Sequence, residues 1–268
     1  MSKIALSICS CKRLDAFTQT ITSLDKHLKD KEIISLIIHY DDSSSPGDRE
    51  KMRELLDKTF PHCYVINKHF EREDIPTHIR HGYIMHTWSS DIKEIGADYV
   101  FHLEDDYGFI KDWYLGDAIN LLKTTPTALS VGICWPDKAS KQNPYQIEYK
   151  DKFYKWIFDS TKEEREVLFD DVVEEEFINS RYPEMGGNYF QKYCNWYGIG
   201  NFGIYDVAKT ATIDNWIRVE EDFEHLLGRR AYQAGYEGWQ YKNRISYHLY
   251  PHGVPHNNSA YDLNKSGR

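Results

Sequence analysis

The amino-acid sequence predicts an α/β protein with a mostly parallel central sheet flanked by helices. Short apolar runs that fit buried strands alternate with longer segments whose apolar residues recur at helical spacing. This alternation starts near residue 4 and continues to about residue 134. Strands that alternate with amphipathic helices form right-handed crossovers, and these crossovers build a doubly wound parallel sheet.

The first half of the chain supplies the alternating elements. Strands are expected over residues 4–9, 33–40, 63–66, 99–103 and 128–134. Helices are expected over residues 14–28, around 52–56, over 79–95 and over 113–122, where apolar side chains recur every three or four positions. Turn-forming residues, such as those of 41–47, separate the elements. Each strand is thus followed by a helix that returns the chain for the next parallel strand.

The second half departs from this pattern. Residues 136–193 are rich in charged and aromatic side chains, and we expect them to interrupt the sheet as an insertion. Residues 195–203 have the glycine density that suits backbone close to a ligand. A helix is expected over 220–234, followed by strands and a histidine-rich tail. The regular alternation therefore covers only the first half.

Length and composition limit the classes of function. A chain of 268 residues can form one large domain, and no linker or internal repeat divides it. The formal net charge of -9 disfavours nonspecific nucleic-acid binding. No apolar run is long enough to span a bilayer, and the first residues form a strand rather than a signal segment. We therefore expect a soluble, cytoplasmic protein.

The cysteines favour the same compartment. They are odd in number, at positions Cys9, Cys11, Cys63, Cys134 and Cys194. Their spacing matches neither a disulfide framework nor a zinc cluster. We expect buried thiols in a reducing environment.

Three consecutive carboxylates, Glu104, Asp105 and Asp106, follow the strand expected over 99–103. Open α/β sheets bind ligands at the carboxyl ends of their strands, and hard oxygen ligands suit Mg²⁺ or Mn²⁺. The pattern indicates a metal-diphosphate site. A solvated turn after the strand is the alternative interpretation.

The order of four landmarks resembles a GT-A glycosyltransferase of the broad family-two type. The landmarks are the strand exit Leu6–Arg13, the turn Asp41–Ser44, the carboxylates Glu104–Asp106 and the pair Glu221–Asp222 with its trailing Arg229, Arg230 and Gly235. Two features depart from the family pattern. Glu104 stands where the family's Asp-x-Asp motif has its first Asp, and the segment between the Glu-Asp pair and Gly235 is about two residues longer. The resemblance implies one GT-A domain over residues 1–268, with a nucleotide-sugar-binding half over 1–134 and an acceptor-binding half with the tail over 135–268.

The resemblance also implies a donor site and a metal site. Asp106 is expected to bind Mn²⁺ or Mg²⁺ directly, with His252 of the tail, or alternatively His248, as an additional ligand. The residues expected to contact the donor nucleotide are Ser10, Lys12, Arg13, Asp41, Asp42, Arg80, Glu104 and Asp105. The competing interpretations are solvated charges at a helix start for Lys12 and Arg13, and a local turn for Asp41 and Asp42.

The chemistry implied is an inverting displacement. Asp222 would act as the general base that takes the acceptor proton, and Glu221 would orient the acceptor. The alternative is that these acids only complement the positive end of a helix dipole. The donor would be a UDP-sugar, with GDP- and dTDP-sugars as alternatives, and the hydroxyl acceptor a carbohydrate, a protein, a small molecule or a modified nucleic acid.

Two other functions compete with this hypothesis. A sugar-nucleotide nucleotidyltransferase shares the α/β plan and the carboxylate-bound metal, but no glycine-rich loop with arginine follows the first strand. A non-catalytic nucleotide- or sugar-binding module of the same fold remains open, because Glu104 departs from the usual motif.

Overall fold

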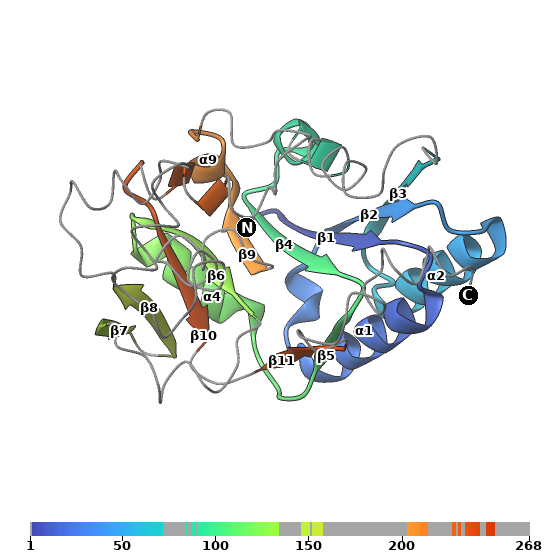
Figure 1. Cartoon of the computed structure of the whole chain (residues 1–268), viewed down its shortest axis with the longest axis horizontal. Coiled ribbons are helices and arrows are strands. Elements are labelled where there is room, and N and C mark those ends of the chain that lie inside the picture. The colour runs from blue at the N-terminus through green and yellow to red at the C-terminus, as the bar shows by residue number, and fades with distance from the viewer. Residues whose placement is uncertain are drawn as a thin grey trace, which may run out of the picture.

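The structure is a computed structural model, and it describes residues 2–71, 84, 87–88, 90–133, 146–150, 152–157, 203–213, 227–228, 230–231, 234–241 and 245–249. Within these residues a nine-stranded sheet has the order β3-β2-β1-β4-β9-β6-β10-β8-β7, and β11 pairs with β5 in a separate two-stranded sheet. Figure 1 shows β1 and β4 side by side, with β5 and β11 beyond the end of β4.

The strands of the large sheet are β1 (Ile4–Ser10), β2 (Leu36–Asp42), β3 (Tyr64–Phe70), β4 (Tyr99–Glu104), β6 (Ala128–Gly132), β7 (Gln146–Lys150), β8 (Phe153–Ile157), β9 (Gly203–Asp206) and β10 (Glu237–Tyr241). The small sheet contains β5 (Tyr107–Phe109) and β11 (Ser246–His248). The pairings show that, among the described strands of the large sheet, only β8 and β9 run against the others. The prediction of a mostly parallel α/β sheet is confirmed.

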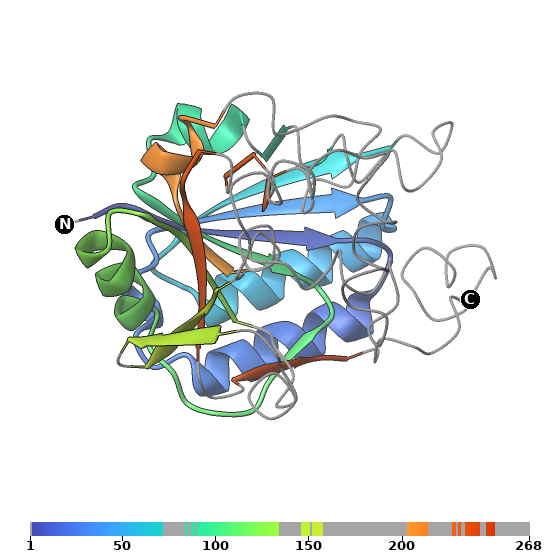
Figure 2. The ribbon, with the colours of Figure 1, turned by 60° about the vertical axis from the view of Figure 1, so that its left-hand side comes forward.

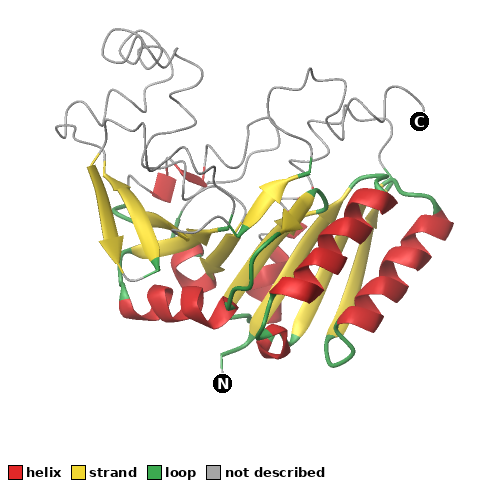
Figure 3. Cartoon of the chain, turned by 90° about the horizontal axis from the view of Figure 1, so that it is seen from below, coloured by secondary structure: helices red, strands yellow, loops and turns green. Residues whose placement is uncertain are grey.

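Helices α1 (Leu14–His27) and α2 (Pro46–Thr59) cover one face of β1, β2 and β3, side by side (Figure 2). Helix α1 buries Phe17, Ile21 and Leu24, which recur at helical spacing and so form one apolar stripe. Helix α2 begins with Ser45, whose hydroxyl accepts a hydrogen bond from the backbone N–H of Asp48 at 3.2 Å. Helix α4 (Leu115–Thr124) and the short α9 (Val207–Thr210) lie near the other half of the sheet (Figure 3).

The central strands of the large sheet are buried. Every residue of β1 and β2 is buried, as expected for parallel strands covered on both faces. Strand β3 lies at the edge of the sheet, and its first residue, Tyr64, is 71% exposed. Residues paired in neighbouring parallel strands point to the same face, so Ser10, Asp41 and His69 form a polar row on the side of α1 and α2.

Several element boundaries differ from the prediction. Residues Lys31–Ile33 form a 3-10 turn, so β2 starts later and includes Asp41 and Asp42, which were expected in a loop. Helix α4 starts after Trp113, because the backbone of Trp113 forms a β-bridge with Leu28 and donates its N–H to the carbonyl of His27 at 3.0 Å.

The region expected to interrupt the sheet contributes to it in part. Strands β7 and β8 form an antiparallel pair, and β8 pairs with β10 at that end of the sheet. The remaining positions of 136–193 lie outside the described residues.

The cysteine and membrane expectations can be compared with the described residues. Cys9 is buried and Cys11 and Cys63 are half-buried free thiols, so the expectation of burial holds fully only for Cys9. Burial raises the pKa of Cys9, and the nearby Glu104 and Asp105 raise it further, which makes this thiol unreactive. Cys134 and Cys194 lie outside the described residues. No helix in the described part of the chain has the length and apolarity needed to cross a membrane.

Candidate active site

Glu104 ends β4, and Asp105 and Asp106 form the turn that follows, whose backbone is held from two sides. The hydroxyl of Thr20, on α1, donates to the carbonyl of Asp105 at 2.9 Å and accepts from the N–H of Tyr107 at 3.1 Å. On the other side, the N–H of Leu249, directly after β11, donates to the carbonyl of Asp106 at 2.7 Å. The turn between β4 and β5 is therefore fixed by a helix and by the last described strand.

Asp105 points into the protein. Its carboxylate accepts a hydrogen bond from the backbone N–H of Cys11 at 3.1 Å and forms an ion pair with Arg13. The side chain is only 1% exposed. Burial, and to a smaller extent the neighbouring Asp106, raises the pKa of Asp105, whereas Arg13 and the Cys11 N–H lower it. The net result is a pKa of about 7. Asp105 therefore holds the turn against the exit of β1.

Arg13 bridges the two aspartates. One guanidinium nitrogen, Nη1, lies 3.0 Å from Oδ2 of Asp106, and the other, Nη2, contacts Asp105. The Arg13 and Asp106 side chains are 8% and 6% exposed. Burial lowers the pKa of Arg13, but the charges of Asp105 and Asp106 outweigh burial and the net shift is upward. The guanidinium thus stays charged between two inward-pointing carboxylates.

The two aspartates that end β2 lie on opposite faces of the strand. Oδ2 of Asp42 lies 3.6 Å from the Sγ of Cys11, the residue whose N–H binds Asp105. Asp41 instead accepts hydrogen bonds from the Ser10 hydroxyl at 3.0 Å and from the Ser44 N–H at 3.2 Å. The sequence placed both aspartates in the donor site, but the structure brings only Asp42 next to the carboxylate turn.

The loops after β1 and β2 are hydrogen-bonded to one another, and each contains one residue with strained backbone dihedral angles. Lys12 has φ 54° and Ser43 has φ 62°, which is the left-handed region that non-glycine residues rarely adopt. The N–H of Lys12 donates to the hydroxyl of Ser44 at 3.1 Å, so the two loops support one another. Backbone strain of this kind costs about 1–3 kcal/mol per residue and concentrates at functional sites.

A polar network that is buried at Ser10 and His39 and reaches the surface at Asn67 lies beside Asp41. His39 contacts the Ser10 hydroxyl through Nε2 at 2.8 Å and the side chain of Asn67 through Nδ1 at 3.1 Å. His69 binds Asp41 through Nδ1 at 2.7 Å. Burial lowers the pKa of His39, although the nearby Asp41 carboxylate opposes this shift. This network positions Asp41 from three strands.

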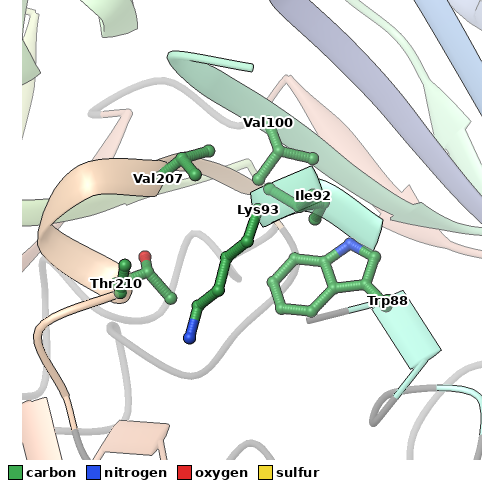
Figure 4. Close-up of a pocket in the computed structure, with 7 residues that line it drawn as sticks. Trp88, Ile92, Lys93, Val100, Val207 and Thr210 are labelled. Atoms are coloured by element: carbon green, nitrogen blue, oxygen red, sulfur yellow. The ribbon is translucent and has the colours of Figure 1, made fainter. Parts of the chain in front are cut away.

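An open cavity of ≈ 390 Å³ adjoins this network. It is lined by His39, Asp41, Pro46, Arg49, Glu50, Arg53, Asn67, Lys68 and His69. It lies between α2 and the ends of β2 and β3, on the Asp41 side of the sheet rather than beside Asp42. A second pocket, shown in Figure 4, has only ≈ 10 Å³ and is lined by Trp88, Ile92, Lys93, Val100, Val207, Thr210 and Ala211. That volume holds no more than about one water molecule, so this pocket is a packing gap.

Other predicted site residues fall outside the part of the chain that can be described. These are Arg80, Glu221, Asp222 and His252. The backbone of His248 is described, and it pairs with Tyr107 in the small sheet, directly after the carboxylate turn. The alternative metal ligand of the tail thus belongs to a strand that lies beside Asp106.

Comparison with solved structures identifies the fold. S. aureus TarS 1-349 in complex with UDP superposes with a TM-score of 0.55 and 13% identity, over 91% of this chain and 60% of that chain. The mannosyltransferase PcManGT from Pyrobaculum calidifontis, in complex with GDP-Man and Mn2+, gives 0.56 and 9%, over 94% and 58%. The neighbours are GT-A proteins. This chain has the GT-A fold.

The comparisons also set limits. No family model matches the sequence, and no curated protein matches it significantly. The chain spans about 60% of the TarS 1-349 and PcManGT chains, and 37% of the longer TarS chain. The likeness therefore establishes the architecture, and the activity of the chain has to be argued from its own residues.

The donor set of the carboxylate turn fits a hard divalent cation. Glu104, Asp105 and Asp106 offer only oxygen ligands, and Arg13 already places a positive charge against two of them. The described residues contain no preformed group of three or more His, Cys, Asp or Glu side chains that could hold a metal. Mg²⁺ and Mn²⁺ sites of nucleotide enzymes need only one or two carboxylates plus substrate phosphates.

Sequence reasoning missed three contributors to the site. Cys11 joins Asp42 to Asp105, Thr20 fixes the carboxylate turn, and His39 supports Ser10. A signal existed for His39 alone, because an imidazole in an otherwise apolar strand, two residues before Asp41, shares a face with that carboxylate. The contacts of Cys11 and Thr20 depend on packing between segments that are far apart in the sequence.

Proposed function

We propose that this protein is a metal-dependent glycosyltransferase that moves a sugar from a nucleotide-sugar donor to a hydroxyl acceptor with inversion. The observation that carries the proposal is the inward carboxylate pair Asp105–Asp106, tied through Cys11 to Asp42 at the carboxyl edge of a GT-A sheet. The structural neighbours crystallised with UDP, UDP-GlcNAc, or GDP-Man and Mn2+ support a nucleotide-sugar donor. We assign residues 1–134 to donor binding and residues 135–268 to acceptor binding.

The donor side is built around the leaving diphosphate. Negative charge grows on that group as the sugar departs, and a bound Mn²⁺ or Mg²⁺ would neutralise it. Asp106 would hold the metal, with a histidine of the tail, His252 or His248, as a further ligand. Asp42 would accept hydrogen bonds from the nucleoside, and Arg13 would face the diphosphate. Asp105 keeps the turn in register with β1 through its bond to Cys11.

The acceptor side needs a base. Asp222 would take the proton of the attacking hydroxyl, and Glu221 would orient the acceptor. An acceptor held on the face of the sugar opposite the diphosphate gives inversion in a single displacement. We propose a UDP-sugar as donor.

The test is incubation of the protein with UDP-glucose, UDP-GlcNAc, GDP-mannose and a dTDP-sugar, each with Mn²⁺. Release of a nucleoside diphosphate, lost in the Asp106→Asn variant, supports the transferase. The matched control is Asp57→Asn, the same chemical change on the exposed surface of α2, where Asp57 is 54% exposed. Pyrophosphate formation from a sugar phosphate and a nucleoside triphosphate indicates a nucleotidyltransferase instead. Binding of a nucleotide sugar without turnover identifies a non-catalytic module.

A further inference from the structure

The Arg13 guanidinium lies where a cation would be needed in the proposed reaction. It contacts both Asp105 and Asp106, and its side chain is 8% exposed. We propose that Arg13 is a built-in counter-ion that competes with the divalent metal for Asp106 until a nucleoside diphosphate arrives and takes over the guanidinium. This inference rests on the proposed function, and it adds that metal and nucleotide bind cooperatively through Arg13.

The charges around the turn explain why a counter-ion is required. Glu104, Asp105 and Asp106 are consecutive, and Asp42 lies across from them beside Cys11. Three of these carboxylates, Asp42, Asp105 and Asp106, are buried, and buried carboxylates need a nearby positive charge, which Asp105 and Asp106 receive. Among the described residues, the guanidinium that contacts both of them is that of Arg13. A side chain of the protein thus supplies the positive charge beside these two carboxylates.

Competition follows from the shared carboxylate of Asp106. Nη1 of Arg13 lies 3.0 Å from Oδ2 of Asp106. A Mg²⁺ or Mn²⁺ ion coordinates carboxylate oxygen at about 2.1 Å, so an ion at Asp106 would lie close to the guanidinium. The metal ion and the guanidinium are both positively charged, and they would repel one another strongly in a site with little water. Metal binding at Asp106 therefore has to move the guanidinium or to bear this repulsion.

The backbone around Arg13 is held by hydrogen bonds that do not involve its guanidinium. Arg13 occupies the N-cap position of α1, but its side chain makes no capping hydrogen bond. The backbone beside it is fixed, because the N–H of Lys12 donates to Ser44 and the N–H of Cys11 donates to Asp105. A change of the Arg13 rotamer would thus release Asp106 and leave both loops in place.

A diphosphate is a suitable new partner for Arg13. The planar guanidinium forms paired hydrogen bonds with phosphate oxygens as well as with carboxylates. With a diphosphate bound, Arg13 neutralises the phosphate and no longer opposes the metal at Asp106. Linkage then requires that the nucleotide raises metal affinity by the same factor by which the metal raises nucleotide affinity.

The experiment measures free Mn²⁺ by electron paramagnetic resonance during titration of the protein at pH 7.5, with and without UDP. In the wild type, we expect weak Mn²⁺ binding alone and a large increase in affinity with UDP. In Arg13→Gln without UDP, we expect Mn²⁺ to bind about tenfold more tightly than in the wild type, because the charged guanidinium no longer competes for Asp106. The increase in Mn²⁺ affinity that UDP causes should be smaller in Arg13→Gln than in the wild type by about the same factor. The increase that is left comes from direct bonds between the metal and the phosphates.

Two further variants make the result decisive. Arg13→Lys keeps the positive charge but loses the planar guanidinium that contacts two carboxylates at once. Its Mn²⁺ affinity should therefore lie between those of the wild type and Arg13→Gln. Arg53→Gln removes the same charge from the exposed surface of α2, where Arg53 is 67% exposed, and should leave Mn²⁺ affinity unchanged. Far-ultraviolet circular dichroism checks folding, and Arg13→Lys provides the comparison if Arg13→Gln does not fold.

Unchanged or weaker Mn²⁺ binding in the folded Arg13 variants would overturn the proposal. Failure of nucleotide binding, on which the proposed function depends, gives a different result, because the wild type would then bind no UDP or other nucleoside diphosphate at any Mn²⁺ concentration. The dependence of Mn²⁺ affinity on Arg13 is measured without nucleotide, so the two failures are distinguishable.

Discussion

The backbone N–H of Cys11 donates a 3.1 Å hydrogen bond to Oδ2 of Asp105. This bond joins the exit of β1 to the turn after β4, and the thiol of the same cysteine reaches Asp42 at the end of β2. One residue thus connects the ends of three neighbouring strands at the edge where open α/β sheets bind their ligands.

Replacement of Asp105 by Asn should change the pH dependence of stability. Burial raises the pKa of Asp105 to about 7, with Arg13 acting in the opposite direction. The unfolded carboxyl ionises near its ordinary pKa of 3.8, so the wild type loses stability as pH rises between the two values. The unfolding free energy of the wild type minus that of Asp105→Asn should fall by up to about 4 kcal/mol from pH 4 to pH 7.5. Urea unfolding at each pH measures this difference. A difference that grows with pH would show that the pKa of Asp105 is not raised in the folded protein.

His39 should produce the opposite trend. Burial lowers the pKa of His39 below the ordinary value of 6.5. The unfolded imidazole takes up a proton below about pH 6.5 while the folded one resists, so stability is lost as pH falls. The unfolding free energy of the wild type minus that of His39→Gln should therefore decrease on acidification and stay constant above neutral pH. His62→Gln, at an exposed position, is the control, and an equal slope in both variants would show that burial of His39 is not the cause.

Gly203 should not tolerate a side chain. A Cβ added at this residue of β9 would collide with the backbone carbonyl of Val131, on the neighbouring strand β6. Backbone cannot yield as a flexible side chain does, so Gly203→Ala should cost about 1–3 kcal/mol of unfolding free energy. Gly47→Ala is the matched control, because a Cβ there meets nothing within 4 Å and alanine favours the helix. Equal urea midpoints for the two variants would contradict the strand pairing.

Asp222 is the residue whose loss should separate turnover from binding. If Asp222 is the base, Asp222→Asn should lower kcat by about 10²-fold or more and leave the KM of the donor nearly unchanged. Steady-state kinetics with an accepted donor provides the measurement. A parallel loss of donor affinity and turnover would assign Asp222 to binding, and full activity would assign the base elsewhere.

The regular elements could be predicted because their signals are local. The apolar run of β1 and the stripe Phe17, Ile21 and Leu24 of α1 are each visible within one segment. The carboxylate turn after β4 was predicted for the same reason. The antiparallel direction of β9 and the pairing of β8 with β10 could not be predicted from the sequence. The pattern of apolar residues in a strand does not indicate which other strand it pairs with.

The candidate site was predictable in residue type but not in arrangement. Arg13 was assigned to the nucleotide, yet the structure pairs it with Asp105 and Asp106, more than 90 positions away in the sequence. Asp41 and Asp42 were both assigned to the donor nucleotide, but alternation along β2 sends them to opposite faces. Such contacts arise only when separate strands are brought to one edge of the sheet.

The most direct test is calorimetric titration of UDP into the wild type and Asp106→Asn, each with and without Mn²⁺. We expect Mn²⁺-dependent binding to the wild type and to the Asp57→Asn control, and loss of that dependence in Asp106→Asn. The melting temperature of Asp106→Asn should remain close to that of the wild type, because the asparagine amide oxygen can still accept from Arg13. Equal Mn²⁺-dependent affinity of the wild type and Asp106→Asn would remove Asp106 from the metal site and contradict the proposed mechanism.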